Sequence, residues 1–302
     1  MKTFEGAFDV LIVGGGPAGL SAGLLLARCR RSIILVDAGK PRNGPSKKLS
    51  GYLTRDGISP REFLELGREE LRRYGVPIRA DSVSAVRRTD GGFEATLGSG
   101  EELRSRRVLL ATGVRDTLPD IEGLRDLYGV SVHHCPYCDG WEHRDRRLVA
   151  YGLGEPAIGL SLLLRRWSDK VVACTDGASV RPESIVQARS NGIDIRFESI
   201  QRLEGRDGRL CEIVFADGEP LPADALFFNT GQVSQSDLAR SLGCELTADG
   251  CVITQHSQST CVPGVYAAGD DDKDVQLVIV AAGEGATAAV AINKDLMRED
   301  TK

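Results

Sequence analysis

The sequence predicts an α/β protein made of two three-layer domains of the Rossmann-like, dinucleotide-binding type. Three observations support this fold class. The chain opens with a β-rich run, a glycine turn and an apolar helical segment, and the same order returns 138 residues later, at Gly152 relative to Gly14. Each copy is followed by a buried-looking strand that ends in a Thr-Gly pair, at Thr112 and at Thr230. We therefore expect two domains of one type rather than one large sheet.

The first copy has the pattern of a complete βαβ unit. A strand is expected over residues 9–13, a turn over 14–19 and a helix over 20–30. A second strand is expected over 33–36 and ends at Asp37. Short Val, Ile and Leu runs bounded by turn residues indicate strands, whereas the longer apolar segment indicates a helix.

The second copy has a strand at 147–151, a glycine turn at 152–157, a helix through Trp167 and a strand at 171–174. The other expected elements are a helix over 60–74, strands near 83–88, 93–97, 108–111, 225–228 and 265–268, and a glycine- and alanine-rich helix after Gln276. The order of these elements places the domain boundaries between motifs rather than in a distinct linker.

Composition and charge exclude several classes of protein. With 302 residues, 41% hydrophobic and 27% charged, the chain is long enough for two cores and does not have the composition of a disordered protein. A formal charge of −5 argues against nucleic acid as the main ligand, because polyphosphate binding requires a basic surface. The longest apolar stretch, 277–292, is too short for a spanning helix and contains Glu284, so we expect no membrane partner.

The expected location is the cytoplasm. The first residues lack the apolar core of a secretory signal. Six cysteines are scattered singly, which fits small core residues in a reducing compartment. They are Cys29, Cys174, Cys211, Cys244, Cys251 and Cys261.

The first glycine turn fits the dinucleotide fingerprint GxGxxG at Gly14, Gly16 and Gly19. The first glycine permits the tight turn, the second lets the backbone approach a pyrophosphate, and the third lets the helix pack on the strand. The helix N-terminus then stabilises the phosphate charge. Asp37, 18 residues after Gly19, is expected to accept hydrogen bonds from a ribose diol.

The second glycine turn is a weaker match. Gly152 and Gly154 fit, but Ala157 stands in the place of the third glycine. Asp176 is expected at the diol-reading position, and no basic cluster follows it, so the site is better suited to NADH than to NADPH. The alternative is a retained fold whose pocket is weak or unused.

Cys135 and Cys138 form a CxxC pair, which indicates either a redox-active dithiol or half of a zinc site. His133, His134 and His143 lie nearby, but no second CxxC or spaced histidine pair completes a usual zinc pattern. We therefore expect redox chemistry and no metal.

Asp139 follows the pair directly and is the candidate for proton transfer to a departing thiolate. The alternative is that it only caps a helix. A carrier is also needed that couples dithiol chemistry to hydride chemistry, and a flavin does both at one ring.

Four motifs, in this order and over nearly the whole chain, resemble those of low-molecular-weight thioredoxin reductases. They are the Gly14–Gly19 turn, Ala111-Thr112-Gly113, Cys135 to Gly140, and Ala267-Ala268-Gly269-Asp270. The resemblance implies an FAD-binding domain made from residues 1–115 and 242–302, and an inserted NAD(P)-type domain over 116–241 that carries the dithiol. It also implies a homodimer, rotation between the domains, and a thioredoxin-like protein or a small disulfide or dithiol as substrate.

By the same resemblance, Cys138 would face the flavin, Cys135 would attack the substrate disulfide, and Asp139 would act as acid and base. Asp270 and Gln276 would contact the ribityl-phosphate and flavin parts of FAD. The positions assigned to this cofactor are Gly14, Gly16, Pro17, Ala18, Gly19, Asp37, Ala111, Thr112, Gly113, Gly269, Asp270 and Gln276. Gly152, Gly154 and Asp176 would hold the second nucleotide, NADH or NADPH.

The chain departs from the family pattern at three places. Residues 175–179 read Thr-Asp-Gly-Ala-Ser where NADPH-dependent members have a His-Arg-Arg cluster. Val275 replaces the usual basic residue before Gln276, and the bulky Pro136-Tyr137 resembles relatives that oxidise dithiols with oxygen. Two alternatives to a thioredoxin reductase therefore stay open, a dithiol oxidase using oxygen and a reductase fed by ferredoxin or another donor.

Overall fold

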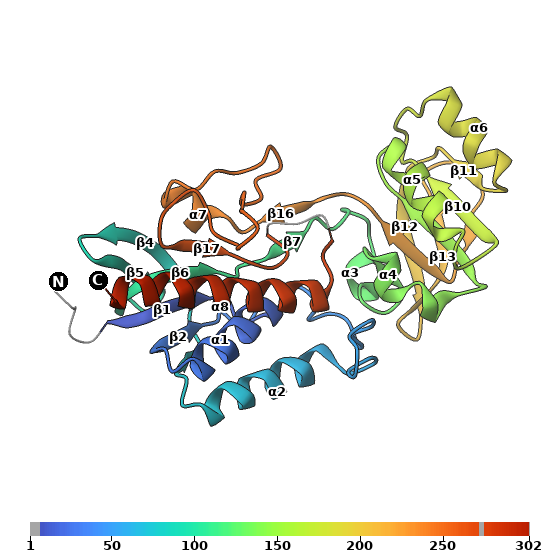
Figure 1. The fold of residues 1–302 in the computed structure, drawn as a ribbon. Coiled ribbons are helices and arrows are strands. Elements are labelled where there is room, and N and C mark those ends of the chain that lie inside the picture. Colours follow the sequence, from blue (N-terminus) through green and yellow to red (C-terminus); the bar gives the residue numbers. More distant parts are fainter. Residues whose placement is uncertain (1–6, 272–274, 302) are drawn as a thin grey trace. The chain divides into compact units, whose positions relative to one another are not determined.

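The computed structural model describes residues 7–271 and 275–301 (Figure 1). These residues form two compact units. Unit 1 contains the described parts of Met1–Gly44, Tyr52–Arg115 and Val233–Lys302, and unit 2 contains Pro45–Gly51 and Asp116–Gln232. Each unit has its own parallel sheet, so the predicted α/β fold class is confirmed.

Unit 1 is built around a seven-stranded sheet with the order β3-β2-β1-β6-β5-β4, with β17 also paired to β6. Strand β1 is parallel to β2 and to β6, and β17 is parallel to β6. Strand β5 is antiparallel to both β4 and β6. The strands are β1 (Phe8–Val13), β2 (Ile33–Val36), β3 (Ile78–Arg79), β4 (Val83–Thr89), β5 (Gly92–Leu97), β6 (Glu102–Leu110) and β17 (Val265–Ala267). The predicted first βαβ unit therefore forms.

The helices of unit 1 are α1 (Pro17–Arg28), α2 (Pro60–Arg73), α7 (Asp237–Ser241) and α8 (Val278–Asp300). Helices α1 and α8 lie side by side (Figure 1). Their contact requires Gly285, because a Cβ atom there would lie 2.0 Å from the Ala18 carbonyl oxygen. The apolar segment before residue 292 is thus a core helix, and no described helix is long and apolar enough to cross a membrane.

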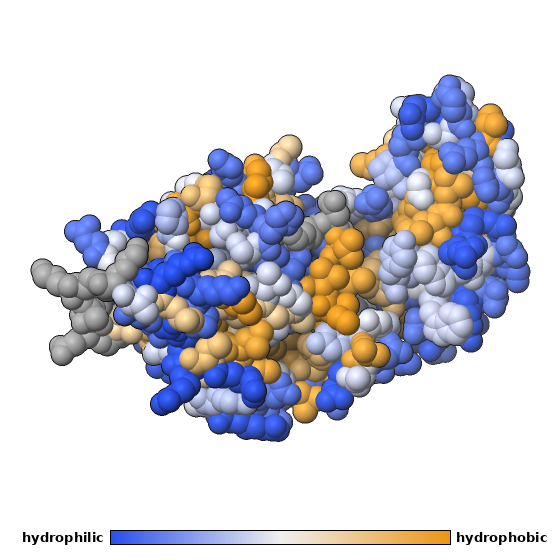
Figure 2. Space-filling view, viewed as in Figure 1, coloured by the Kyte–Doolittle hydropathy of each residue, from blue (hydrophilic) through white to orange (hydrophobic). Residues whose placement is uncertain are grey.

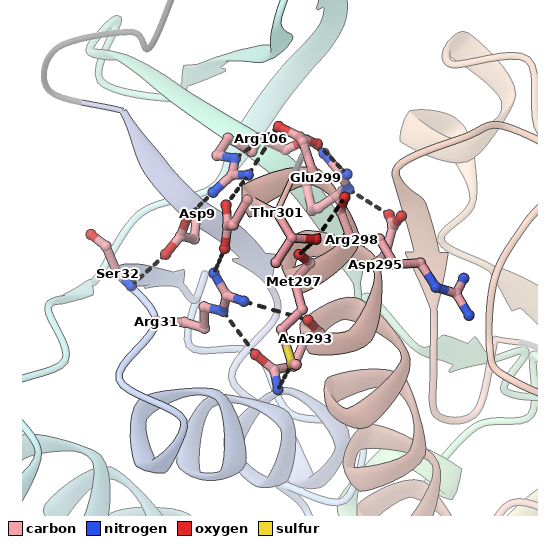
Figure 3. A network of polar contacts seen from close by, with 12 residues as sticks. Asp9, Arg31, Ser32, Arg106, Asn293, Asp295, Met297, Arg298, Glu299 and Thr301 are labelled. Carbon is pink, nitrogen blue, oxygen red and sulfur yellow. Dashed lines mark hydrogen bonds and ion pairs between the residues drawn. The ribbon is translucent and has the colours of Figure 1, made fainter. Parts of the chain in front are cut away.

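The C-terminal end of α8 is tied to the sheet by ion pairs (Figure 3). The Arg106 guanidinium lies 2.7 Å from Asp9, 2.9 Å from Glu299 and 2.6 Å from Asp300. Arg31 approaches the other oxygen of Asp300 at 2.7 Å. Charges from β1, β6, α8 and the segment that follows α1 therefore meet around the last turn of α8, which ties this end of the helix to the sheet.

Unit 2 has a five-stranded parallel sheet with the order β11-β10-β9-β15-β8 and a three-stranded antiparallel sheet with the order β12-β13-β14. The strands are β8 (Val132–His133), β9 (Arg147–Tyr151), β10 (Lys170–Cys174), β11 (Asp194–Arg196), β12 (Ile200–Arg206), β13 (Arg209–Phe215), β14 (Leu221–Pro222) and β15 (Ala225–Phe228). The helices are α3 (Leu124–Leu127), α4 (Pro136–Asp139), the 3-10 helix η1 (Trp141–His143), α5 (Glu155–Leu164) and α6 (Pro182–Ser190).

The chain passes between the units at two strands, β7 (Val114–Asp116) and β16 (Gln232–Ser234), which pair with each other. Residues 233–241, which the sequence places before its second boundary, belong to unit 1. These residues belong to unit 1 because Ala239 of α7 is buried in the same hydrophobic core as Val86 and Phe93 of the unit 1 sheet.

Candidate active site

The glycine turn after β1 is closed by contacts that exclude side chains. Gly14 has a φ of +110°, and a Cβ atom there would lie 2.1 Å from the Ala111 carbonyl oxygen. A Cβ atom at Gly19 would lie 1.9 Å from the Gly14 carbonyl oxygen. By contrast, no described heavy atom lies within 4 Å of the position that a Cβ atom of Gly16 would take. The backbone is therefore bare at Gly16, where the fingerprint brings a pyrophosphate close.

Helix α1 begins at this bare position. Gly16 is the N-cap and has extended backbone angles, and Pro17 is the first helical residue. Because Gly16 has no side chain, the first turn depends on an external acceptor for its N–H groups, and the positive end of the helix dipole favours an anion. The turn fits the pyrophosphate of FAD.

Asp37 follows β2 directly and its carboxylate lies over the glycine turn. A Cβ atom at Gly15 would lie 2.5 Å from Asp37 Oδ2. Asp37 Oδ1 accepts a hydrogen bond from the Gly39 backbone at 3.0 Å, and Oδ2 accepts one from Arg68 of α2 at 2.9 Å. The sequence identifies Asp37 but not Arg68, since the pairing joins two elements 31 positions apart.

The Ala111-Thr112-Gly113 motif follows β6, and Gly113 has a φ of +63°. The Thr112 hydroxyl donates to Asp271 Oδ2 at 3.2 Å, and the Thr112 carbonyl accepts from the Gln235 side chain at 3.0 Å. Asp271 is buried. This second loop of unit 1 is therefore fixed by residues that follow β17 and β16.

The Gly269-Asp270 turn is held by a buried acid. Gly269 has a φ of +100°, and its N–H donates to Glu284 Oε2 of α8 at 2.8 Å. Glu284 is the acidic residue in the apolar stretch that argued against a membrane-spanning helix. Its side chain is 8% exposed and accepts this hydrogen bond inside the protein. The Gln276 side-chain amide donates to the Asp270 carbonyl at 3.1 Å, which brings these two predicted cofactor residues together.

The disulfide of unit 2 is closed at the start of helix α4. Cys135 and Cys138 are bonded, with their Cα atoms 5.3 Å apart. Cys135 is the N-cap of α4, and the Cys138 N–H donates to Cys135 Sγ at 3.2 Å. Both cysteines are half-buried, whereas Tyr137 between them is 69% exposed. The predicted redox pair is thus formed and accessible at its centre.

Exposed aromatic side chains flank the disulfide. Trp141 of η1 is 65% exposed, with the Arg144 guanidinium 4.2 Å above its ring. Tyr137 contacts Trp167 edge-on, with ring centroids 5.8 Å apart. The face shown in Figure 2 carries hydrophobic areas between hydrophilic ones, and exposed apolar or aromatic surface of this kind can serve for contact with a partner. Tyr137 and Trp141 therefore present exposed aromatic surface next to the two cysteines in the sequence.

Asp139 is in contact with a buried histidine pair. Its Oδ2 lies 3.4 Å from His133 Nδ1, and His133 Nε2 lies 3.0 Å from His143 Nε2. The pKa of His143 is lowered to about 4, mainly because burial disfavours the charged imidazolium form. Positive charge on the neighbouring His133 lowers this pKa further. Among the described residues no three His, Cys, Asp or Glu side chains are arranged to hold a metal ion.

His134 belongs to a different group. Its Nδ1 lies 3.0 Å from the Tyr128 hydroxyl and 3.6 Å from Asp116 Oδ2. The sequence shows three histidines near the CxxC pair but cannot show which one contacts Asp139. His133 ends the short strand β8 and His134 follows it, and the two side chains make different contacts.

The second glycine turn is closed by its own neighbours. The Gly154 N–H donates to the Thr175 carbonyl at 3.2 Å, and a Cβ atom at Gly154 would lie 2.7 Å from the Ser179 carbonyl oxygen. At Gly152 a Cβ atom would lie 2.9 Å from the Ala157 backbone nitrogen. The N–H group that a pyrophosphate would use at Gly154 thus already has a protein acceptor.

The acid of the second turn is occupied as well. Asp176 Oδ2 accepts from the Tyr151 hydroxyl at 2.8 Å, and Oδ1 accepts from the Ile200 backbone at 3.1 Å. Glu155, the first residue of α5, carries a negative charge at the start of this helix, and hydrogen bonds from Arg181 lower the pKa of its carboxyl to about 2. The diol-reading acid and the first residue of α5 in this turn are thus both engaged within the protein.

Comparison with known proteins gives consistent matches. Residues 8–285 match the family described as pyridine nucleotide-disulphide oxidoreductase. The chain is 32% identical to thioredoxin reductase aclD of Aspergillus oryzae, covering 96% of both chains. It is 31% identical to thioredoxin reductase tcpT of Claviceps purpurea, covering 96% of this chain and 95% of the relative.

Two solved structures are close in fold. HlmI is 39% identical, with a TM-score of 0.95, over 99% of this chain and 95% of the other. The putative thioredoxin reductase TrxB from Bacillus anthracis is 33% identical, with a TM-score of 0.92, over 97% of this chain and 99% of the other.

A CxxC disulfide beside an acid, on a fold with a dinucleotide glycine turn, defines the class of FAD-dependent disulfide oxidoreductases. The chain belongs to the pyridine nucleotide-disulphide oxidoreductase family, and over nearly its whole length it is similar to thioredoxin reductases. The resemblance drawn from the sequence is confirmed, and so are the enzyme class and the FAD cofactor.

Proposed function

We propose that this enzyme transfers an electron pair between a disulfide or dithiol substrate and FAD through Cys135 and Cys138, with Asp139 as acid and base. The observation that carries the proposal is the Cys135–Cys138 disulfide at the N-cap of α4, with the Asp139 carboxyl on the same short helix. FAD, when bound, supplies the two-electron carrier. The cofactor residues of unit 1 and the first domain boundary, at 115, are part of the proposal.

Reduction of a substrate proceeds by two exchange steps. The Cys135 thiolate attacks one sulfur of the substrate disulfide, whose S–S bond breaks and releases one substrate thiolate. Cys138 then attacks Cys135 Sγ, releases the second substrate sulfur and re-forms the protein disulfide. Two electrons pass from the cysteine pair to the substrate, while Asp139 accepts the proton of the attacking thiol. Oxidation of a dithiol is the same sequence in reverse.

The substrate proposed first is the disulfide of a thioredoxin-like protein, which the reductase names of the relatives support. A homodimer in the cytoplasm completes the proposal. The cytoplasmic location is supported by six cysteines that are not in disulfides, since an oxidising compartment would favour their pairing. In this direction of flux, the electrons must come from NADH, NADPH or another reduced donor.

The second candidate is dithiol oxidation with oxygen as the final acceptor. It is favoured by the second glycine turn, where Gly154 and Asp176 use their nucleotide-facing groups within the protein. A flavin that is reduced by a substrate dithiol needs no nicotinamide. A reductase fed by ferredoxin or another donor would share this feature.

Anaerobic titration of the yellow holoenzyme tests the proposal. Dithiothreitol is expected to bleach the flavin absorbance, and a flavin that stays oxidised would contradict electron transfer through the cysteine pair. Cys138→Ser should remove any thiolate-to-flavin absorbance, whereas Cys29→Ser, at an exposed free cysteine, should not change it.

Separate additions then decide the direction. Bleaching by NADH or NADPH supports the reductase. Bleaching by dithiothreitol alone, followed by rapid reoxidation in air with formation of peroxide, supports the oxidase. Bleaching by dithiothreitol alone with slow reoxidation in air supports the reductase fed by a different donor.

A further inference from the structure

Asp139 is the end of a three-membered chain of side chains that crosses three elements. His133 ends strand β8, His143 ends η1, and Asp139 ends α4. The two histidines are 4% and 7% exposed, and both rings pack against Phe227, with centroids 5.4 Å and 6.1 Å away. A buried polar pair that reaches a candidate acid and base needs an explanation beyond packing.

The burial of His143 determines where its proton lies. Its pKa of about 4 makes it neutral in the working range, so it carries one ring proton. His143 Nδ1 is buried and has no hydrogen-bond partner among the described residues. A buried N–H donor without a partner is rarer than a buried acceptor without one, which places the proton on Nε2.

This tautomer directs the rest of the chain. His143 Nε2–H donates to His133 Nε2 across 3.0 Å, so His133, when neutral, carries its own proton on Nδ1. The proton of His133 is then on the nitrogen that lies 3.4 Å from Asp139 Oδ2. Besides His133 and Asp139, the charged groups that act on His143 are Arg146 and Arg209, and both lower its pKa.

We propose that His133, oriented by His143, is a positioning residue for Asp139 that holds the carboxylate ready to accept the proton of an attacking thiol. The inference rests on the proposed function and assigns His133 and His143 a role that Asp139 alone does not require. The proton passes from thiol sulfur to a carboxylate oxygen while the thiolate forms the new S–S bond, and the His133 N–H keeps the accepting oxygen in place.

The test follows reduction of the Cys135–Cys138 disulfide in the oxidised, anaerobic holoenzyme by dithiothreitol at several pH values. N-ethylmaleimide stops the reaction, mass spectrometry of the peptide counts the alkylated cysteines, and the loss of flavin absorbance counts the electron pairs that the cysteines have already passed to FAD. Without a base, the rate rises about tenfold per pH unit below the thiol pKa, because only the thiolate attacks. With Asp139 as base, the wild-type rate should depend on pH less steeply.

Three variants separate positioning from packing. His133→Phe keeps a ring but removes the donor, and we expect its rate at about pH 6.5 to fall about tenfold and its pH dependence to steepen. His133→Asn keeps an N–H near the position of Nδ1 and should stay within about threefold of the wild type. His134→Phe is the matched control, and its pH dependence should equal that of the wild type.

The Asp139→Asn variant shows how far the reduction rate falls when the proposed base is removed completely. If His133 acts through Asp139, the double variant His133→Phe with Asp139→Asn should be no slower than Asp139→Asn alone. Additive losses, or a His133→Phe rate reduced equally at every pH, would overturn the inference. If His133→Phe does not fold, His143→Phe takes its place: a steeper pH dependence supports the inference and an unchanged one overturns it. Failure of dithiothreitol to reduce the wild-type disulfide would instead contradict the proposed function.

Discussion

The Arg42 guanidinium lies 2.8 Å from the Asp270 carboxylate, which joins the loop after β2 to the turn after β17. The same nitrogen donates to the Gln276 side-chain oxygen at 2.6 Å. Val275, where the family resemblance leads us to expect a basic residue, is 55% exposed and brings no charge. Arg42 therefore supplies a cation at the predicted cofactor turn from the opposite end of the chain.

Arg42→Ala is expected to weaken FAD binding about 10- to 100-fold, since charge-assisted hydrogen bonds contribute about 1.5–3 kcal/mol. Arg42→Lys should retain part of the affinity, because it keeps the charge but not the two-sided geometry. The measurement is the dissociation constant of FAD for the apoprotein, followed by flavin fluorescence. Arg61→Ala, at an exposed position of α2, is the control and should bind FAD as the wild type does. Equal affinities for Arg42→Ala and wild type would show that Arg42 only connects two loops.

Gly14 and Gly16 should separate folding from cofactor binding. Gly16→Ala meets no described atom within 4 Å and has an ordinary backbone conformation, so the apoprotein should keep its stability while FAD affinity falls. Gly14→Ala places a Cβ atom 2.1 Å from the Ala111 carbonyl at a φ of +110° and should destabilise the apoprotein by about 1–3 kcal/mol. Denaturant unfolding of both apoproteins, together with FAD titration, checks the contrast. A Gly16→Ala variant with wild-type FAD affinity would place the pyrophosphate elsewhere.

The ion pairs at the end of α8 should make unit 1 sensitive to acid. Burial opposes ionisation, but hydrogen bonds from Arg107 lower the pKa of both Asp295 and Glu299. Carboxyls with folded pKa values below their unfolded ones stabilise the protein above about pH 4, and this stability is lost as the pH falls through the folded values. Unfolding of the wild type should thus become easier below that pH.

Arg107→Gln is expected to lower the free energy of unfolding at neutral pH by about 1–3 kcal/mol, because its 13% exposed side chain pairs with Asp295 at 2.7 Å and Glu299 at 2.6 Å. The difference from the wild type should shrink as the carboxyls become protonated. Arg202→Gln, which breaks an exposed pair with Glu204, should change stability by less than about 1 kcal/mol. A loss that is independent of pH would assign the effect of Arg107 to packing alone.

The sequence predicts the parts of this structure that are local. Gly14, Gly16 and Gly19 identify the turn because the three lie within six residues and two of them, Gly14 and Gly19, have no room for a Cβ atom. The repeated order of strand, turn and helix predicts the parallel strands of both sheets, because each of these elements has a local sequence pattern of its own. Cys135 and Cys138 are close because they are three positions apart.

Contacts between distant segments are not encoded in any single pattern. Arg42 with Asp270 and Arg68 with Asp37 depend on how loops and helices pack over the sheet, and an arginine on a polar helix face has the same sequence pattern whether it pairs or is solvated. Whether His133 or His134 contacts Asp139 depends on which of the two side chains lies on the side that faces η1. The second boundary likewise depends on the burial of Ala239 against β4 and β5.

The contacts of Asp176 predict how nicotinamide binding can be changed. In the wild type, NADH and NADPH should both bind weakly, because the Gly154 N–H already donates to the Thr175 carbonyl and the Asp176 carboxylate already accepts from Tyr151 and Ile200. Tyr151→Phe removes the hydroxyl donor and keeps the ring, which frees Oδ2 to accept from a ribose hydroxyl, so NADH should bind about 3- to 10-fold more tightly. NADPH should not gain, since its 2′-phosphate would face the same carboxylate. Tyr128→Phe, at a tyrosine that pairs with Asp116, is the matched control and should change neither affinity. Isothermal titration of the oxidised holoenzyme measures both nucleotides, and tight NADPH binding by the wild type would show that the turn at Gly154 opens in solution.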